Sequence, residues 1–136
     1  MRTVVLDASL ALALVLPDES SARVERLLRE QERRSIDIVT APHWMIELQN
    51  GVLQAARRRR IARTDRVPAL DLLASLPVRT LSVETPAAGL LALADREGLS
   101  AYDAVYLALA LERGALLATA DKRLAAAARG HDILWP

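Results

Sequence analysis

The sequence predicts an α/β fold with a central, mostly parallel sheet of four to five strands that helices cover on both faces. Short runs of β-branched and aliphatic residues alternate along the chain with longer stretches of helical periodicity. This alternation is typical of parallel sheets, because parallel neighbours are joined by crossover connections that are usually helical. With 136 residues, of which 52% are hydrophobic and 26% charged, the chain has the composition of one globular domain over 1–136.

The expected strands share short runs of Val, Ile, Leu, Ala and Thr. They span 3–6, 36–40, 78–83 and 115–119, and 133–135 is a possible fifth. Pro42 closes the second of them, because proline lacks the N–H that a ladder needs. The third alternates in polarity, as a half-buried strand does.

Helical stretches connect these strands. They span 10–16, a segment from Ser20 or Ser21, 43 to about 59, 64–76, 86–98, 100–113 and 122–129. Hydroxyl side chains suited to capping precede most of them, namely Ser9, Ser20 or Ser21, Thr64, Thr85 and Ser100. Pro17 stops the first helix, and Gly114 is the expected C-terminal stop of the helix over 100–113.

The overall composition limits the possible functions. The net charge is only +1, so any attraction to nucleic acid must come from a local patch. The absence of cysteine excludes disulfide scaffolds and thiolate zinc sites, and it fits a reducing cytoplasm. The longest apolar stretch, from Ala8 to Pro17, is too short to span a bilayer, so no membrane association is expected. The sequence contains no Gly-rich phosphate loop, so a nucleoside triphosphate site is not expected.

Two aspartates come after predicted strands at corresponding positions. Asp7 directly follows Val4-Val5-Leu6, and Asp121 follows the strand that ends at Thr119. Ligand sites in such sheets lie at the carboxyl ends of the strands, so the two acids would share one crevice if their strands are neighbours. Helix capping explains each aspartate singly, and both interpretations stay open.

Two further acids interrupt helical stretches that are otherwise apolar. Asp103 is the only charged residue from Ala101 to Leu111, so we expect its carboxylate to be buried, although a structural salt bridge to an arginine is an alternative. Glu47 belongs to a polar stripe at helical spacing, which a solvated helix face would also produce; its other members are His43, Asn50, Gln54 and Arg57.

Four carboxylates in one pocket remain ionised together only if cations neutralise them. Mg²⁺, or Mn²⁺ in its place, accepts oxygen ligands, lowers the pKa of bound water and stabilises charge that develops on a phosphate. Ser9, Asn50 and Thr119 would orient water or phosphate beside such an ion. His43 and His131 stand in no ligand spacing and are interpreted as incidental.

The only dense basic run is Arg57-Arg58-Arg59-Arg60, followed by Arg63 and Arg66. Cations at this position complement the C-terminal end of a helix dipole and can simply be solvated. Alternatively, the run guides RNA phosphates toward the acids. Both interpretations stay open. Four aromatic residues in the whole chain are too few for a broad base-stacking platform.

Taken in order, these motifs resemble the PIN-domain family, and most closely its VapC-type toxins. They are Val5-Leu6-Asp7-Ala8-Ser9, Glu47-x-x-Asn50, Ser100-x-Tyr102-Asp103-Ala104 and Thr119-x-Asp121-x-x-Leu124. The resemblance implies an α/β/α sandwich and a Mg²⁺-dependent endoribonuclease of a type II toxin–antitoxin system. It also implies a homodimer that a small antitoxin inhibits by inserting a segment into the active site.

The resemblance further implies that Asp7, Glu47, Asp103 and Asp121 form the catalytic, metal-binding quartet, with Ser9, Asn50 and Thr119 in support. Some relatives carry another acid after the last motif, where Lys122 and Arg123 stand here, so the number of metal ions stays open. A catalytically silent PIN-like module that binds RNA or a protein is the alternative. A receiver-like phosphorylation switch is disfavoured, because the third strand ends in Leu81-Ser82-Val83 without an acceptor aspartate.

Overall fold

The computed structural model describes residues 1–136 and contains a four-stranded sheet in the order β3-β2-β1-β4. The strands are β1 (Arg2–Leu6), β2 (Ile36–Thr40), β3 (Arg79–Thr80) and β4 (Leu116–Ala118). Every pairing is parallel. Because β1 pairs with β4, the strands that precede Asp7 and Asp121 are neighbours, which is the condition for the two acids to meet.

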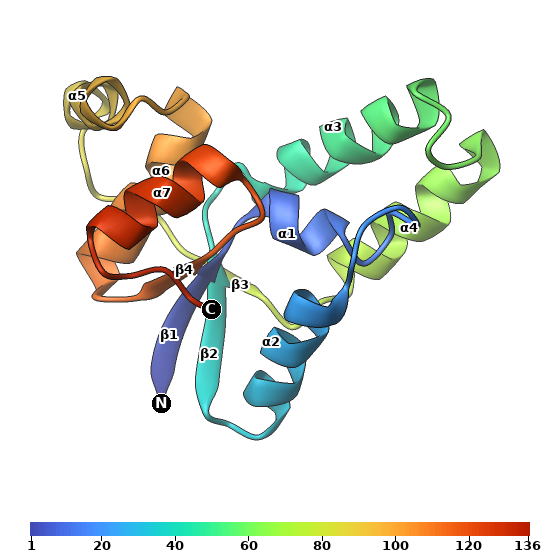
Figure 1. Cartoon of the computed structure of the whole chain (residues 1–136), viewed down its shortest axis with the longest axis horizontal. Helices are drawn as coiled ribbons and strands as arrows, with labels where there is room; N and C mark the ends of the chain where they lie inside the picture. The colour runs from blue at the N-terminus through green and yellow to red at the C-terminus, as the bar shows by residue number, and fades with distance from the viewer.

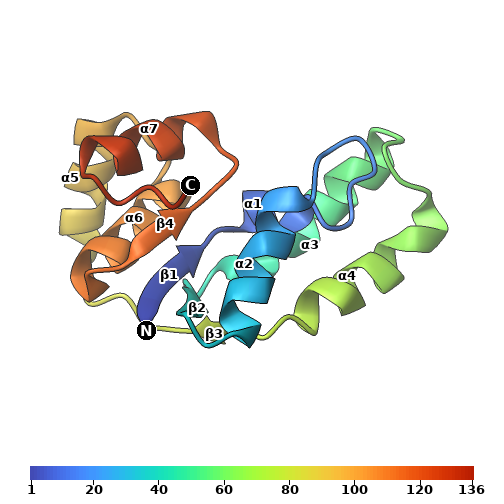
Figure 2. The same ribbon diagram turned by 60° about the horizontal axis from the view of Figure 1, so that its bottom comes forward.

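Helices cover both faces of this sheet (Figure 1), and turning the molecule separates the layers (Figure 2). One layer contains α1 (Ala8–Leu12), α2 (Ala22–Glu32), α3 (Trp44–Arg57) and α4 (Arg66–Ala74). The other contains α5 (Ala87–Glu97), α6 (Ala101–Arg113) and α7 (Lys122–Gly130). The helices α3 and α4, joined through the 3-10 turn η1 (Arg63–Asp65), form a hairpin that projects from the sheet (Figure 1). The predicted three-layer α/β/α fold is confirmed.

Alternate residues of β1 face the two layers, as the period of a strand requires. Val4 and Leu6 pack into a core with residues of α1, α2, α3 and α4, whereas Val5 packs into a second core with α5, α6 and α7. All three side chains are fully buried. Burial of such a side chain stabilises the fold by about 1.5–3 kcal/mol. The buried strand β1 therefore fixes the position of Asp7, the next residue, at the carboxyl edge of the sheet.

Three predicted strands are shorter than expected, and of the stretch 115–119 only Leu116–Ala118 forms a strand. Only Arg79 and Thr80 of the stretch 78–83 pair with β2, because the chain beyond them turns toward α6. There the Glu112 carboxylate accepts the backbone N–H groups of Glu84 and Thr85, in place of a strand partner. The stretch 133–135 is reduced to one parallel bridge between Leu134 and Leu117.

The helices lie where predicted, with corrections at their ends. The first α-helix ends at Leu12, and tighter turns continue toward Pro17. Its N-cap is Asp7, not Ser9. Thr64 lies within η1, and the N-cap of α5 is Pro86, not Thr85. Ser21, Ser100 and Gly114 occupy the predicted terminal positions. None of the helices is both long enough and apolar enough to cross a bilayer.

Candidate functional site

The four predicted acids line one pocket of about 720 Å³ at the carboxyl edge of the sheet. Asp7 directly follows β1, and Asp121 lies between β4 and α7. Glu47 is in the first turn of α3, and Asp103 is in the first turn of α6. The pocket is also lined by Ser9 and Asn50, together with the apolar or partly apolar side chains of Leu12, Ile46, Leu53 and Tyr102. The fold therefore brings together side chains that span more than a hundred residues of sequence.

Asp7 is the most constrained acid. Its side chain is only 2% exposed, and its Oδ1 accepts the N–H of Leu10 at 3.0 Å, which caps α1. The Ser9 hydroxyl donates to Oδ1 at 2.8 Å and lies 2.9 Å from Oδ2. The buried Thr119 hydroxyl donates to Oδ2. Ser9 and Thr119 thus hold this carboxylate in one orientation, a contact that the sequence analysis did not predict for them.

Asp121 is linked to the same network through its backbone. Its N–H donates to Thr119 Oγ1 at 3.0 Å, and its Oδ1 accepts the N–H of Leu124 at 2.8 Å to cap α7. The two interpretations of Asp7 and Asp121 are therefore compatible, because both acids cap helices and both line the pocket. Capping leaves Asp121 Oδ2 without a hydrogen bond from the protein.

Asp103 departs from the prediction that it is buried. Its side chain is partly exposed at the pocket, because the first turn of α6 emerges from the core there. Neighbouring Tyr102 is 62% exposed, whereas Tyr106, one turn later, is fully buried. An apolar sequence around an acid did not reveal that the helix end is open. Asp103 pairs with no arginine, so the salt-bridge alternative is wrong.

Glu47 lies beside His43, which shares its predicted polar stripe, and near Tyr106 of α6. His43, interpreted as incidental, places Nε2 at 3.3 Å from Glu47 Oε1 and at 2.9 Å from the carbonyl oxygen of Tyr102. The imidazole ring lies 4.5 Å from the ring of Tyr106. The Tyr106 hydroxyl is buried and has no hydrogen-bond partner. The spacing of four residues predicted that His43 and Glu47 share one face of the helix, whereas the contact with Tyr106 was not predicted.

The electrostatics of the pocket raise the pKa of two of its acids, Asp7 and Asp103. Burial raises the pKa of Asp7 from its ordinary value of 3.8 to about 7, and the charge of Asp103 adds to the effect. The hydrogen bonds from Thr119, Leu10 and Ser9 act in the opposite direction but do not cancel it. Burial also raises the pKa of Asp103, as do the charges of Asp121 and Glu47. The four acids therefore act on one another electrostatically.

None of the four carboxylates forms an ion pair with arginine or lysine. Oxygen donors without a cationic partner suit a hard divalent cation such as Mg²⁺. As the side chains stand, however, no three of the Asp, Glu and His residues are close enough together to hold a metal ion. The donor set fits in its chemistry, and binding would require the other carboxylates to turn toward Asp7, which its hydrogen bonds hold in place.

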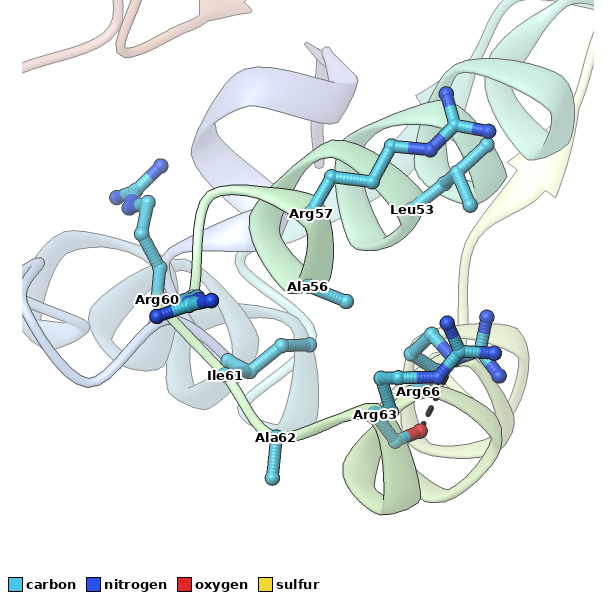
Figure 3. Close-up of a pocket in the computed structure, with 9 residues that line it drawn as sticks. Leu53, Ala56, Arg57, Arg60, Ile61, Ala62, Arg63 and Arg66 are labelled. Carbon is cyan, nitrogen blue, oxygen red and sulfur yellow. Dashed lines mark hydrogen bonds between the residues drawn. The ribbon is translucent and has the colours of Figure 1, made fainter.

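The arginine run forms a second feature, which we call the arginine hollow (Figure 3). This hollow of about 780 Å³ lies where α3 ends and α4 begins, and its cationic lining comprises Arg57, Arg59, Arg60, Arg63 and Arg66. Arg60 differs from the other four, because its guanidinium binds Asp18 and Glu19 at 2.8 and 2.7 Å. Arg58 is exposed and does not line the hollow.

Comparisons with known proteins agree with the geometry. The PIN domain model matches residues 4–130. Ribonuclease VapC3 of Pyrobaculum aerophilum is 34% identical over 125 residues, which cover 89% of this chain and 91% of that protein. The solved structure of PAE2754 from the same organism has a TM-score of 0.70 and 25% identity, covering 92% of this chain and 78% of that one.

A further solved structure, of Mycobacterium tuberculosis VapC20, a sarcin-ricin loop cleaving toxin, has a TM-score of 0.64. The match covers 91% of this chain and 94% of that one, and at 22% identity it shows a shared fold. Together with the acidic pocket, these matches establish that the chain belongs to the PIN-domain family, in agreement with the VapC-type resemblance of its motifs.

Proposed function

We propose that this protein is a Mg²⁺-dependent endoribonuclease, the toxin of a type II toxin–antitoxin pair, and that Mn²⁺ can replace Mg²⁺. The main support is that four acids line one pocket, namely Asp7, Glu47, Asp103 and Asp121. No arginine or lysine side chain neutralises any of these carboxylates. The 34% identity to a ribonuclease of the VapC group supports RNA as the substrate.

The supporting residues have distinct proposed roles. Ser9 and Thr119 fix the orientation of Asp7, so this carboxylate is positioned before any ligand arrives. Asp103 and Asp121 offer oxygens that the protein leaves free, and exposed Asn50 can donate to a phosphate oxygen. When bound, a divalent cation would supply an activated water and stabilise the charge that develops on the phosphate.

The VapC-type resemblance supports the proposed partners. These are an RNA substrate, a small cognate antitoxin and a second copy of the chain in a homodimer, in the cytoplasm. The rim of the acidic pocket includes exposed Ile46 and Tyr102, at 60% and 62% exposure, which are suited to contact a segment that enters the pocket. We propose that the whole chain, 1–136, acts as one domain.

The decisive experiment measures RNA cleavage with Mg²⁺, with Mn²⁺ and with EDTA. We expect cleavage only with a divalent cation, and a loss of more than about a hundredfold in Asp103→Asn or Asp7→Asn. Asp95→Asn, which removes an exposed acid on α5, is the matched control and should cleave like the wild type. Circular dichroism verifies that each variant is folded. Cleavage at the wild-type rate in EDTA would refute the proposal.

The same assay distinguishes the alternative of a silent PIN-like module. Such a module would bind RNA or a protein without cutting, so the wild type and Asp103→Asn would leave RNA equally intact. The free oxygens of Asp121 and Asp103 favour the enzyme, because a binding module has no need of unneutralised acids beside its RNA phosphates.

A further inference from the structure

The arginine hollow is lined by five arginines and by no acid. Figure 3 shows the side chains of Arg57, Arg63 and Arg66 around it, with Ile61 and Ala62 on the connecting segment. Of its five arginines, only Arg60 forms ion pairs. The other four carry unneutralised charge in close proximity, which destabilises the free protein and favours an anionic ligand.

The position of the hollow relates it to the acidic pocket. Leu53 lines both cavities, so they are adjacent along α3. Glu47 and Arg57 lie at opposite ends of this helix, ten residues apart, which corresponds to about 15 Å at the helical rise. A polynucleotide strand with a phosphate in the acidic pocket can therefore continue along α3 to the arginines.

Arg59 lines the hollow from the turn that ends α3. Arg59 follows the C-cap of α3 with φ of +58°, a left-handed conformation that glycine adopts most readily. The N–H of Arg60 closes the turn by donating to the Ala55 carbonyl at 2.8 Å. Glycine would satisfy this turn with less strain, so Arg59→Gly removes the side chain and its charge while it preserves the end of α3.

We propose that the arginine hollow binds backbone phosphates of RNA on one side of the bond that is cut. The inference deepens the proposed ribonuclease function and rests on it. Guanidinium groups form forked hydrogen bonds to phosphate oxygens, and several of them around one hollow match the repeated charge of a strand. An acidic segment of a protein partner is the competing occupant, and the experiment below separates the two.

A matched pair of variants makes the test sharp. Arg34 also follows a helix C-cap, that of α2, with φ of +57°, and the N–H after it closes the same type of turn. Arg34 is exposed and lies outside the hollow. Arg59→Gly and Arg34→Gly therefore remove the same charge and relieve the same backbone strain. Only Arg59→Gly removes a proposed phosphate contact.

Binding is measured with a fluorescein-labelled single-stranded RNA in the Asp103→Asn background, which prevents cleavage, over a series of salt concentrations. Each lost contact to a single strand lowers the slope of log affinity against log salt by about 0.7, which is roughly fivefold in affinity at 0.1 M salt. We expect this loss for Arg59→Gly, twice the slope change for Arg59→Gly with Arg63→Ala, and no loss for Arg34→Gly.

Equal RNA affinity of the Arg59→Gly and Arg34→Gly variants would overturn the inference. RNA affinity that is unchanged while binding of labelled poly-glutamate falls would overturn it in favour of an acidic protein segment. An RNA cleavage assay distinguishes failure of the phosphate-binding inference from failure of the proposed ribonuclease function. In the cleaving protein, Arg59→Gly should raise KM for long RNA, leave kcat unchanged, and leave cleavage of a dinucleotide unaffected. Failure of the ribonuclease proposal itself would appear as metal-independent or absent cleavage by the wild type.

Discussion

Replacement of Asp7 by asparagine should stabilise the folded protein at neutral pH while it abolishes the proposed activity. Asp7 is 2% exposed, and its pKa is raised from 3.8 to about 7, mainly by burial. In the folded protein the carboxyl group therefore stays protonated at pH values where the unfolded chain has already released the proton. Asparagine is neutral at every pH and has nearly the same shape.

The size of the effect follows from the pKa difference. Between pH 3.8 and about 7 the folded state binds more protons than the unfolded state, so the free energy of unfolding falls as pH rises. The contribution of protonated Asp7 is present in full below the unfolded pKa and is lost as pH rises through the folded one. The complete loss is about 4 kcal/mol, since one pKa unit corresponds to about 1.4 kcal/mol.

Asparagine should retain most of the local hydrogen bonds. Its oxygen can accept the N–H of Leu10, so the cap of α1 is preserved. Its amide group would face the hydroxyls of Ser9 and Thr119, which can accept as well as donate. The pKa of about 7 already includes the hydrogen bonds to the ionised carboxylate, and poorer hydrogen bonds of asparagine than of the protonated carboxyl group offset about 1–2 kcal/mol of the gain. The variant should therefore be more stable than the wild type by about 2–3 kcal/mol at pH 8.

The assay is urea unfolding of both proteins from pH 4 to pH 8 in EDTA. The difference between the two proteins isolates Asp7, because the other titrating groups are common to both. We expect the difference to grow through this range in favour of Asp7→Asn, whereas Asp95→Asn should follow the wild type. Parallel curves for the wild type and Asp7→Asn would show that Asp7 carries no buried-charge penalty, and a variant that is less stable at pH 8 would refute the reasoning.

Three further predictions concern the pocket and the core. Tyr106→Phe should change stability by less than about 1 kcal/mol, because the hydroxyl has no partner to lose; a loss above 2 kcal/mol in thermal denaturation would contradict this geometry. Leu107→Ala should cost about 2–5 kcal/mol in urea unfolding, since Leu107 is fully buried, whereas Leu111→Ala, at 40% exposure, should cost far less; equal losses would contradict the packing. Mn²⁺ at a hundredfold excess over its dissociation constant should stabilise the wild type by about 2.7 kcal/mol and raise its Tm, and should stabilise Asp103→Asn less; equal shifts would argue against Asp103 as a ligand.

The order of the strands and helices could be predicted from sequence because local signals agree with the tertiary packing. Ser100 and Gly114 bound α6 as their chemistry predicts, with the Ser100 hydroxyl accepting the Asp103 N–H and Gly114 in a left-handed conformation. The stretch 78–83 has the alternation of a strand, yet its length depends on a contact that is remote in sequence. The Glu112 carboxylate accepts the backbone N–H groups of Glu84 and Thr85, which would otherwise be available to a neighbouring strand. The hydrophobic periodicity of 78–83 does not reveal this contact.

The membership of the acidic pocket could be predicted, but its details could not. Strand ends and the order of motifs were sufficient to bring Asp7 and Asp121 together. The exposure of Asp103 depends on where α6 leaves the core, which an apolar sequence does not specify. The His43 ring contacts Tyr106, which belongs to another helix far along the chain. Spacing within one helix reports neighbours on that helix only.

Two buried polar groups near this pocket, the carboxyl group of Asp7 and the hydroxyl group of Tyr106, are unfavourable for the stability of the free protein. Asp7 is a buried acid whose ionisation costs stability, and Tyr106 holds a buried hydroxyl without a partner close to the charges of Glu47 and Asp7. Each could be removed by a conservative substitution that preserves packing, so neither is needed for the fold. A pocket optimised for the free protein would lack both features. A cationic ligand in the pocket would relieve the charge of Asp7, whereas the capping of α1 alone leaves the cost of its ionisation in place.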